Sequence, residues 1–159
     1  MEKISSFTVN HLDLLTGVYV SRVDQLKDES ITTFDLRFTR PNAEPVMDTA
    51  AIHALEHLGA TFLRNHTAWK ERVVYFGPMG CRTGFYLILG GSYVSEDIMD
   101  LLGEMLRFIQ GFEGDIPGAS AKDCGNYLDM NLPMAKWYAE KYYREAIQNP
   151  VPERMHYPK

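Results

Sequence analysis

The residues best suited to chemistry lie in one short segment, His53-Ala54-Leu55-Glu56-His57. If this segment is an α-helix of about 3.6 residues per turn, His53, Glu56 and His57 share one face. Two neutral imidazoles on that face can hold a divalent metal, with a carboxylate beside them as a general base. The alternative is a pair of ordinary histidines on a solvated helix.

The flanking residues predict this helix. Asp48 can cap its first turn, and residues 49–52 contain no helix breaker. Apolar residues then recur at helical spacing and predict a core-facing stripe made of Ile52, Leu55, Leu58, Phe62 and Leu63. We therefore expect the histidine pair at the edge of the core.

A catalytic metal site needs a third protein ligand and an open position. By residue type the candidates are Cys81, Cys124 and a carboxylate such as Glu104, and spacing does not choose among them. The chain has 2 cysteines, so a reducing compartment would leave both thiols free. Two inert buried cysteines are the alternative.

The composition is that of a globular protein, with 45% hydrophobic and 23% charged residues among 159. We expect one catalytic, metal-binding domain over residues 1–148 and a loosely ordered, proline-rich tail over residues 149–159. The net charge of −5 argues against nucleic acid as a partner. No apolar run resembles a secretory signal or a membrane span, so we expect a cytoplasmic protein.

The remaining elements predict an α+β fold. Strands are expected at residues 18–20, 31–38, 72–76 and 85–89, and further helices from Ser95 to Gly111 and from Asn131 to about Ile147. Because strands and helices do not alternate regularly, we expect a single antiparallel-type sheet covered by helices, with the metal-motif helix packed on the sheet. The glycine-rich loop 77–84 would present Cys81 outward.

Five motifs, in order over roughly residues 5 to 148, make the chain resemble S-ribosylhomocysteine lyase, the enzyme family behind autoinducer-2 synthesis. The amino-terminal Ser6-Phe7-Thr8-Val9-Asn10-His11 also matches the opening of that family. The motifs are His53-Ala-Leu-Glu56-His57-Leu, Arg64-Asn65-His66, Gly77-Pro78-Met79-Gly80-Cys81-Arg82-Thr83-Gly84-Phe85-Tyr86, Phe34-Asp35-Leu36-Arg37-Phe38 with Pro41-Asn42, and Cys124-Gly125-Asn126-Tyr127.

The resemblance implies a ligand set of His53, His57 and Cys124, and an acid–base pair of Glu56 and Cys81. It also implies one divalent metal per subunit, ferrous iron in the cell, which zinc or cobalt can replace. The protein would be a homodimer with its sites at the interface.

The resemblance further implies that Ser6, His11 and Arg37 hold the hydroxyl groups of the sugar. Taken singly, Arg37 is equally explained by a pair with Asp35 on the same strand face. The chain departs from the family pattern at Tyr75, where many members have Asp, and at Met130, where many have His. Neither position is an implied ligand or acid–base residue, so the implied reaction stands.

The implied substrate, S-ribosylhomocysteine, is split into homocysteine and 4,5-dihydroxy-2,3-pentanedione after its carbonyl has migrated until the sulfur is β to it. A metal would stabilise each enediolate as a Lewis acid, while Cys81 and Glu56 move protons. A useful thiolate requires a thiol pKa below about 8.5, and the metal and Arg82 are plausible causes. Two other classes stay open: an HxxEH zinc metallopeptidase, and a non-enzymatic module with a structural Cys2His2 site.

Overall fold

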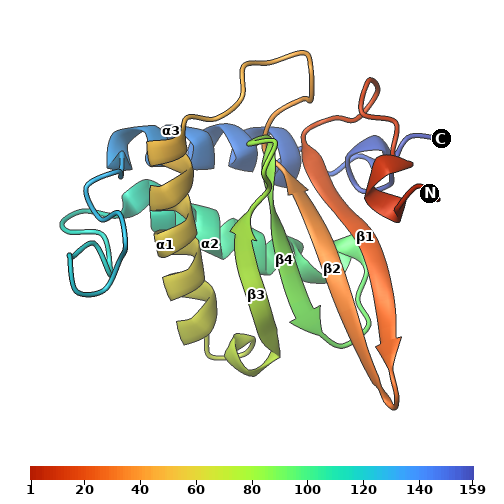
Figure 1. Ribbon diagram of the computed structural model, residues 1–159, viewed down its shortest axis with the longest axis horizontal. Coiled ribbons are helices and arrows are strands. Elements are labelled where there is room, and N and C mark those ends of the chain that lie inside the picture. The colour runs from red at the N-terminus through yellow and green to blue at the C-terminus, as the bar shows by residue number, and fades with distance from the viewer.

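A computed structural model describes residues 1–159 and confirms the predicted α+β class (Figure 1). One antiparallel sheet has the strand order β1-β2-β4-β3. Three α-helices and several short turns complete the chain. The bounds are β1 Gly17–Leu26, β2 Glu29–Arg37, α1 Thr49–Asn65, β3 Val73–Pro78, β4 Gly84–Gly90, α2 Met99–Gly111 and α3 Leu132–Tyr142.

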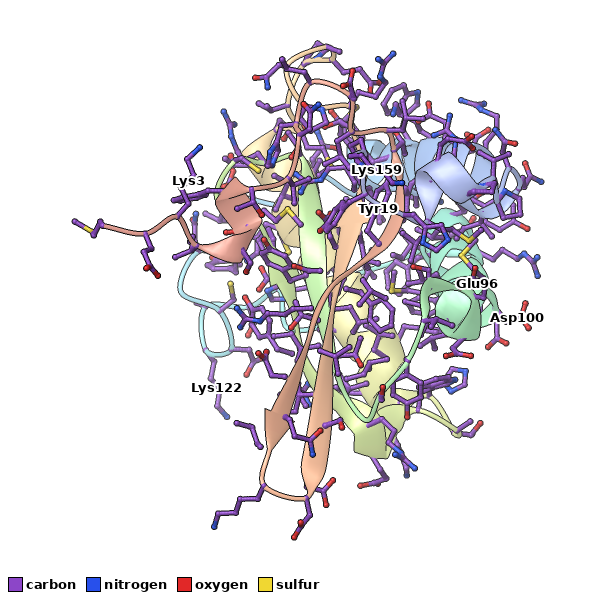
Figure 2. The ribbon with its side chains drawn as sticks, turned by 90° about the vertical axis from the view of Figure 1, so that its right-hand side faces the viewer. Lys3, Tyr19, Glu96, Asp100, Lys122 and Lys159 are labelled. Carbon is purple, nitrogen blue, oxygen red and sulfur yellow. The ribbon has the colours of Figure 1, made fainter.

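The two faces of the sheet differ in side chains and in covering. On β2, Phe34 and Leu36 point to the core and are fully buried. Thr33, Asp35 and Arg37 alternate with them and so lie on the opposite face. Figure 2 shows α2 and α3 on one side of the sheet, and the amino-terminal segment with the loop around Lys122 projecting on the other.

Helix α1 forms as the sequence predicts. The Asp48 side chain accepts a hydrogen bond from the Ala51 backbone N–H at 3.0 Å, which caps the first turn. The helix packs against β3, α2 and α3. Strand β3 packs closely at Gly59, because a Cβ there would lie 2.5 Å from the Phe76 ring. The metal-motif helix is thus fixed at one edge of the sheet.

Strand β1 is much longer than the predicted residues 18–20. It pairs with β2 from Gly17 to Leu26 as a hairpin, with Lys27 in the left-handed region at φ 55°. Beyond Val20 the strand extends past the core, and its residues are exposed or half-buried. The outer half therefore lacks the apolar alternation that marks a half-buried strand.

The helix boundaries differ slightly from the prediction. Residues Ser95–Ile98 form a 3₁₀ turn, and α2 itself begins at Met99. The Asn131 side chain caps α3 by accepting from the Met134 N–H at 3.0 Å. After Tyr142 the helix widens into a π-helical turn over Tyr143–Ile147, which brings its end to the predicted residue.

The segment over residues 149–159 makes specific contacts with β1 and the turn before it. It contains a 3₁₀ turn, η5 Pro152–Arg154. Arg154 donates to the Thr16 carbonyl at 2.6 Å, and the Tyr19 hydroxyl donates to the Glu153 carbonyl at 3.1 Å. Its division from a domain over residues 1–148 stays a prediction. None of the helices has the length and apolar character that crossing a membrane requires.

Candidate active site

His53, His57 and Cys124 form a cluster with the donor types of a metal site. Their ligand atoms all lie within 4.8 Å of one another, and all three residues are half-buried. The Cys124 sulfur lies 3.4 Å from Nε2 of His53. A set of two imidazoles and one thiolate suits Zn²⁺, Fe²⁺ or Co²⁺ and leaves a tetrahedral position open, so these residues fit a catalytic metal.

The loop between α2 and α3 orients both imidazoles. Nδ1 of His53 lies 3.0 Å from the Asp129 carbonyl oxygen, and Nδ1 of His57 lies 2.8 Å from the Pro117 carbonyl oxygen. A carbonyl oxygen only accepts, so each Nδ1 carries the proton and each Nε2 keeps a lone pair for the cluster. Such partners fix the tautomer and ring orientation of a metal-binding histidine.

Glu56 faces the same cavity as His53. This cavity of about 290 Å³ is lined by Thr49, Ile52, His53, Glu56, Pro78, Met79, Gly80, Arg82 and Asp129. Glu56 is half-buried, so its carboxylate is available to a bound molecule. We call this the metal-side cavity.

Cys81 lies in a second cavity of about 350 Å³, which we call the thiol cavity. Its lining includes all three expected sugar-binding residues. It consists of Ser6, Phe7, Val9, His11, Ser21, Asp35, Arg37, Pro78, Met79, Gly80, Cys81, Tyr86 and Tyr157. Only Pro78, Met79 and Gly80 line both cavities.

Arg37 and Thr83 place hydrogen-bond donors beside the Cys81 thiol. Arg37 Nη1 donates to the Thr83 hydroxyl oxygen at 2.6 Å, and that oxygen lies 3.1 Å from the Cys81 sulfur. Since the guanidinium only donates, the Thr83 oxygen is the acceptor and its own proton is free to point at the sulfur. Arg37 Nη1 also lies 3.9 Å from the sulfur. Both contacts favour a thiolate.

The balance of these effects lowers the pKa of Cys81. Partial burial is the largest single effect and raises the pKa, but the hydrogen bonds from Thr83 and the charge of Arg37 together outweigh it. The cation responsible is thus Arg37 and not Arg82, which the sequence suggested. Arg82 adopts φ 60° in the loop and lines the metal-side cavity instead.

Arg37 is itself held by Asp35, with which it forms a buried ion pair. Its Nε and Nη2 donate to the two carboxylate oxygens at 3.1 and 2.6 Å. The two side chains are 4% and 2% exposed. The pair and the cavity position coexist, because Nη1 is left over for Thr83 and Cys81. The pairing with Asp35 therefore does not compete with a role in the site.

The structure thus brings the expected site residues together in two groups. His53, His57, Cys124 and Glu56 form one, and Ser6, His11, Arg37 and Cys81 form the other. Cys81 is absent from the metal-ligand cluster of a single chain, which leaves the Cys2His2 alternative one ligand short. Tyr75 and Met130, the two departures, line neither cavity.

Sequence reasoning missed several groups that shape the site. Thr83 lies within a quoted motif, and its position two residues after Cys81 was the available signal. Tyr157 was missed because it belongs to the segment expected to be loosely ordered. The carbonyls of Pro117 and Asp129 carry no residue-type signal, since any residue supplies a carbonyl.

Comparison with known proteins agrees with the motifs. The family model for S-ribosylhomocysteinase (LuxS) matches residues 4–153. The chain is 63% identical over 158 residues to the S-ribosylhomocysteine lyase of Clostridium beijerinckii, with 99% of each chain covered. It is equally similar to that of Clostridium acetobutylicum, at 63% and 99% of each chain. The enzyme of Phocaeicola vulgatus is 51% identical, with 99% of this chain and 98% of the relative covered. This chain belongs to the S-ribosylhomocysteine lyase family.

Proposed function

We propose that this chain is a metal-dependent lyase that cleaves the thioether of S-ribosylhomocysteine to homocysteine and 4,5-dihydroxy-2,3-pentanedione, the autoinducer-2 precursor. The observation that carries the proposal is the pairing of a two-histidine, one-cysteine donor set with a separate, activated thiol. A metallopeptidase has no use for that thiol. Relatives that bear this enzyme name match the chain over 99% of its length and 99% of their own.

The metal would be held by His53, His57 and Cys124. It would supply Lewis-acid stabilisation of the negative charge that develops on the sugar oxygens. We propose ferrous iron, one per subunit, with zinc or cobalt able to replace it, because imidazole and thiolate donors suit all three. Metal analysis of anaerobically purified protein distinguishes them.

Cys81 and Glu56 would divide the proton transfers between carbon and oxygen. As a thiolate, Cys81 removes the weakly acidic C–H proton and returns it to the neighbouring carbon as a thiol. Glu56 moves protons between hydroxyl oxygens and assists the final β-elimination, in which the homocysteine sulfur leaves. Ser6, His11 and Arg37 hold the sugar hydroxyls so that the C–H bond faces the sulfur.

The separation of the two cavities supports a homodimer. Within one chain Cys81 and Glu56 line different cavities, yet the reaction needs both at one sugar. We propose that the thiol cavity of one subunit faces the metal-side cavity of its partner, giving two equivalent sites. Large apolar side chains are exposed on this part of the surface: Phe7, which lines the thiol cavity, is 69% exposed, and Leu128, next in sequence to Asp129 of the metal-side cavity, is 80% exposed.

Two inactive variants test this arrangement. A 1:1 mixture of Cys81→Ala and His57→Ala subunits, allowed to exchange, would form heterodimers with one complete site. Random pairing then restores about a quarter of the wild-type activity. No recovery after demonstrated subunit exchange would place each complete site within one chain, and a fully active monomer in sedimentation would contradict the dimer itself.

The central experiment follows free thiol released from S-ribosylhomocysteine by anaerobically metallated protein. Release of one thiol per substrate consumed, together with pentanedione formation, is the expected result. Peptide hydrolysis that persists in the Cys81→Ala variant would point to the metallopeptidase instead. A reducing cytoplasm is the proposed location, because the site depends on two free thiols.

A further inference from the structure

The buried ion pair behind the thiol continues to a third side chain, Tyr157. Its hydroxyl donates to Oδ2 of Asp35 at 2.9 Å, the oxygen that also accepts from Nη2 of Arg37. Tyr157 also lines the thiol cavity. Hydrogen bonds therefore run without a gap from Tyr157 through Asp35, Arg37 and Thr83 to the Cys81 sulfur.

Tyr157 is held in place by contacts that do not involve the cavity. Its ring stacks on Tyr19 of β1, with centroids 5.0 Å apart and planes 13° from parallel. The Tyr19 hydroxyl bonds to the carbonyls of Leu15 and Glu153 at 3.0 and 3.1 Å, which fixes the segment just before Tyr157. Figures 1 and 2 both show the carboxyl-terminal end beside β1, and Figure 2 labels Tyr19 there. The stacking on Tyr19 thus orients the Tyr157 ring so that its hydroxyl points at Asp35.

The contact with Tyr157 contributes to the burial of Asp35, the partner of Arg37. Both lie on the sheet face away from α2 and α3, yet they are only 1% and 4% exposed. Tyr157 closes that face over Asp35. Away from water a carboxylate needs hydrogen-bond donors, and Tyr157 supplies one beyond those of Arg37.

We propose that Tyr157 is a positioning residue for the thiolate of Cys81, acting through Asp35 and Arg37. The proposal rests on the function proposed above for Cys81. By sharing the Asp35 charge, the phenol leaves more of the guanidinium charge uncompensated at the sulfur. It also keeps Asp35 from drawing the guanidinium away from Thr83.

The charges around the sulfur give the direction of the effect. Arg37 is the cation beside the sulfur. The other ionisable groups that line the cavity are His11, Asp35, Tyr86 and Tyr157. Burial, and next the charge of Asp35, raise the pKa of Tyr157, so the phenol stays a donor through neutral pH. Removing its hydroxyl exposes the sulfur to more of the Asp35 charge, which disfavours the thiolate.

The test is the pH dependence of Cys81 alkylation by iodoacetamide in the full chain, read on the peptide that carries Cys81 by mass spectrometry. Tyr157→Phe keeps the stacked ring and removes only the hydroxyl. We expect its alkylation profile to move to higher pH. We also expect kcat for S-ribosylhomocysteine to fall about fivefold, with little change in KM. This decrease is smaller than the effect of removing a hydrogen bond to a charged group directly at the sulfur.

Tyr143→Phe is the matched control, because it removes a tyrosine hydroxyl that accepts hydrogen bonds from Arg107 and does not line the thiol cavity. Its profile should overlay the wild type. Both variants are assayed below their melting temperatures, so folding does not enter the comparison. A Tyr157→Phe profile identical to wild type, or an equal shift in both variants, overturns the proposal. Absence of homocysteine release by the wild type would instead refute the proposed function, since alkylation needs no substrate.

Discussion

The metal cluster and the thiol cavity are assembled in opposite ways. Two of the three residues in the cluster lie one helical turn apart on α1, and one loop supplies Cys124 and both carbonyls that orient the imidazoles. The thiol cavity draws on the amino-terminal segment, all four strands, the 79–81 loop and Tyr157. A local cluster tolerates changes elsewhere in the fold, whereas a dispersed cavity depends on the packing of the whole chain.

The two regions also use their surroundings for different ends. At the cluster, neutral carbonyls select a tautomer and leave charge to the metal. At the thiol, a buried guanidinium and a hydroxyl supply the positive potential themselves. The first arrangement gains its electrostatic strength only when metal is bound, and the second keeps it in the metal-free protein. Variants in the two regions should therefore separate metal content from thiol reactivity.

The largest effect should come from the cluster. His57→Ala removes a ligand, so metal content should fall from about one per subunit to near zero and homocysteine release should be lost. The melting temperature should fall as well, because metal binding is linked to folding. His66→Ala, which removes a histidine paired with Glu104 outside the cluster, should keep its metal. Equal metal loss in both variants would contradict the ligand assignment.

Cys81→Ala should separate chemistry from metal binding. Loss of an acid–base group should lower kcat by about 10² to 10⁴-fold, with metal content unchanged. Elemental analysis and turnover on the same preparation check both parts. Glu56→Gln should behave alike, because it keeps the shape of the side chain and removes the base. If Cys81→Ala lost its metal as completely as Cys124→Ala, Cys81 would be a ligand and the two regions would be one.

Gly118→Ala should weaken the metal through the loop that orients His57. Gly118 has φ +74°, and a Cβ there would lie 3.2 Å from Nδ1 of His57, the atom bonded to Pro117. The displaced imidazole should raise the metal Kd by about tenfold or more, with little change in turnover at saturating metal. Gly114→Ala is the control, because it has φ +94° and an open surrounding. The metal Kd is measured by competition titration against a chelator. An equal rise in the Kd of both variants would mean that backbone strain, and not the contact with His57, weakens metal binding.

The contrast between the regions explains what the sequence could predict. The histidine pair, its helix and the Asp48 cap are local patterns, and the structure bears them out. Thr83 is a local partner of Cys81, but the rest of the hydrogen-bonded path is not: Thr83 joins Arg37 across 46 positions of sequence, and Tyr157 joins Asp35 across 122. Residue type placed Asp35 and Arg37 on the less apolar face of a strand, but only tertiary packing buries them there.

The smallest of these effects is expected at Thr83, where it reports most directly on the thiol. Thr83→Val keeps the shape of the side chain but removes the donor to Cys81 and the acceptor of Arg37. The pKa of Cys81 lies below its ordinary value, with the bonds from Thr83 the main lowering cause. The wild-type thiolate therefore forms at lower pH than a free thiol, and the alkylation profile of the variant should shift to higher pH.

At neutral pH, kcat/KM of Thr83→Val should fall about tenfold and recover as pH rises through the new pKa of Cys81. Thr83→Ser should restore the profile, since it returns the hydroxyl. An unshifted alkylation profile in Thr83→Val would mean that Arg37 alone sets the thiol and that the hydrogen-bonded path through Thr83 is not needed.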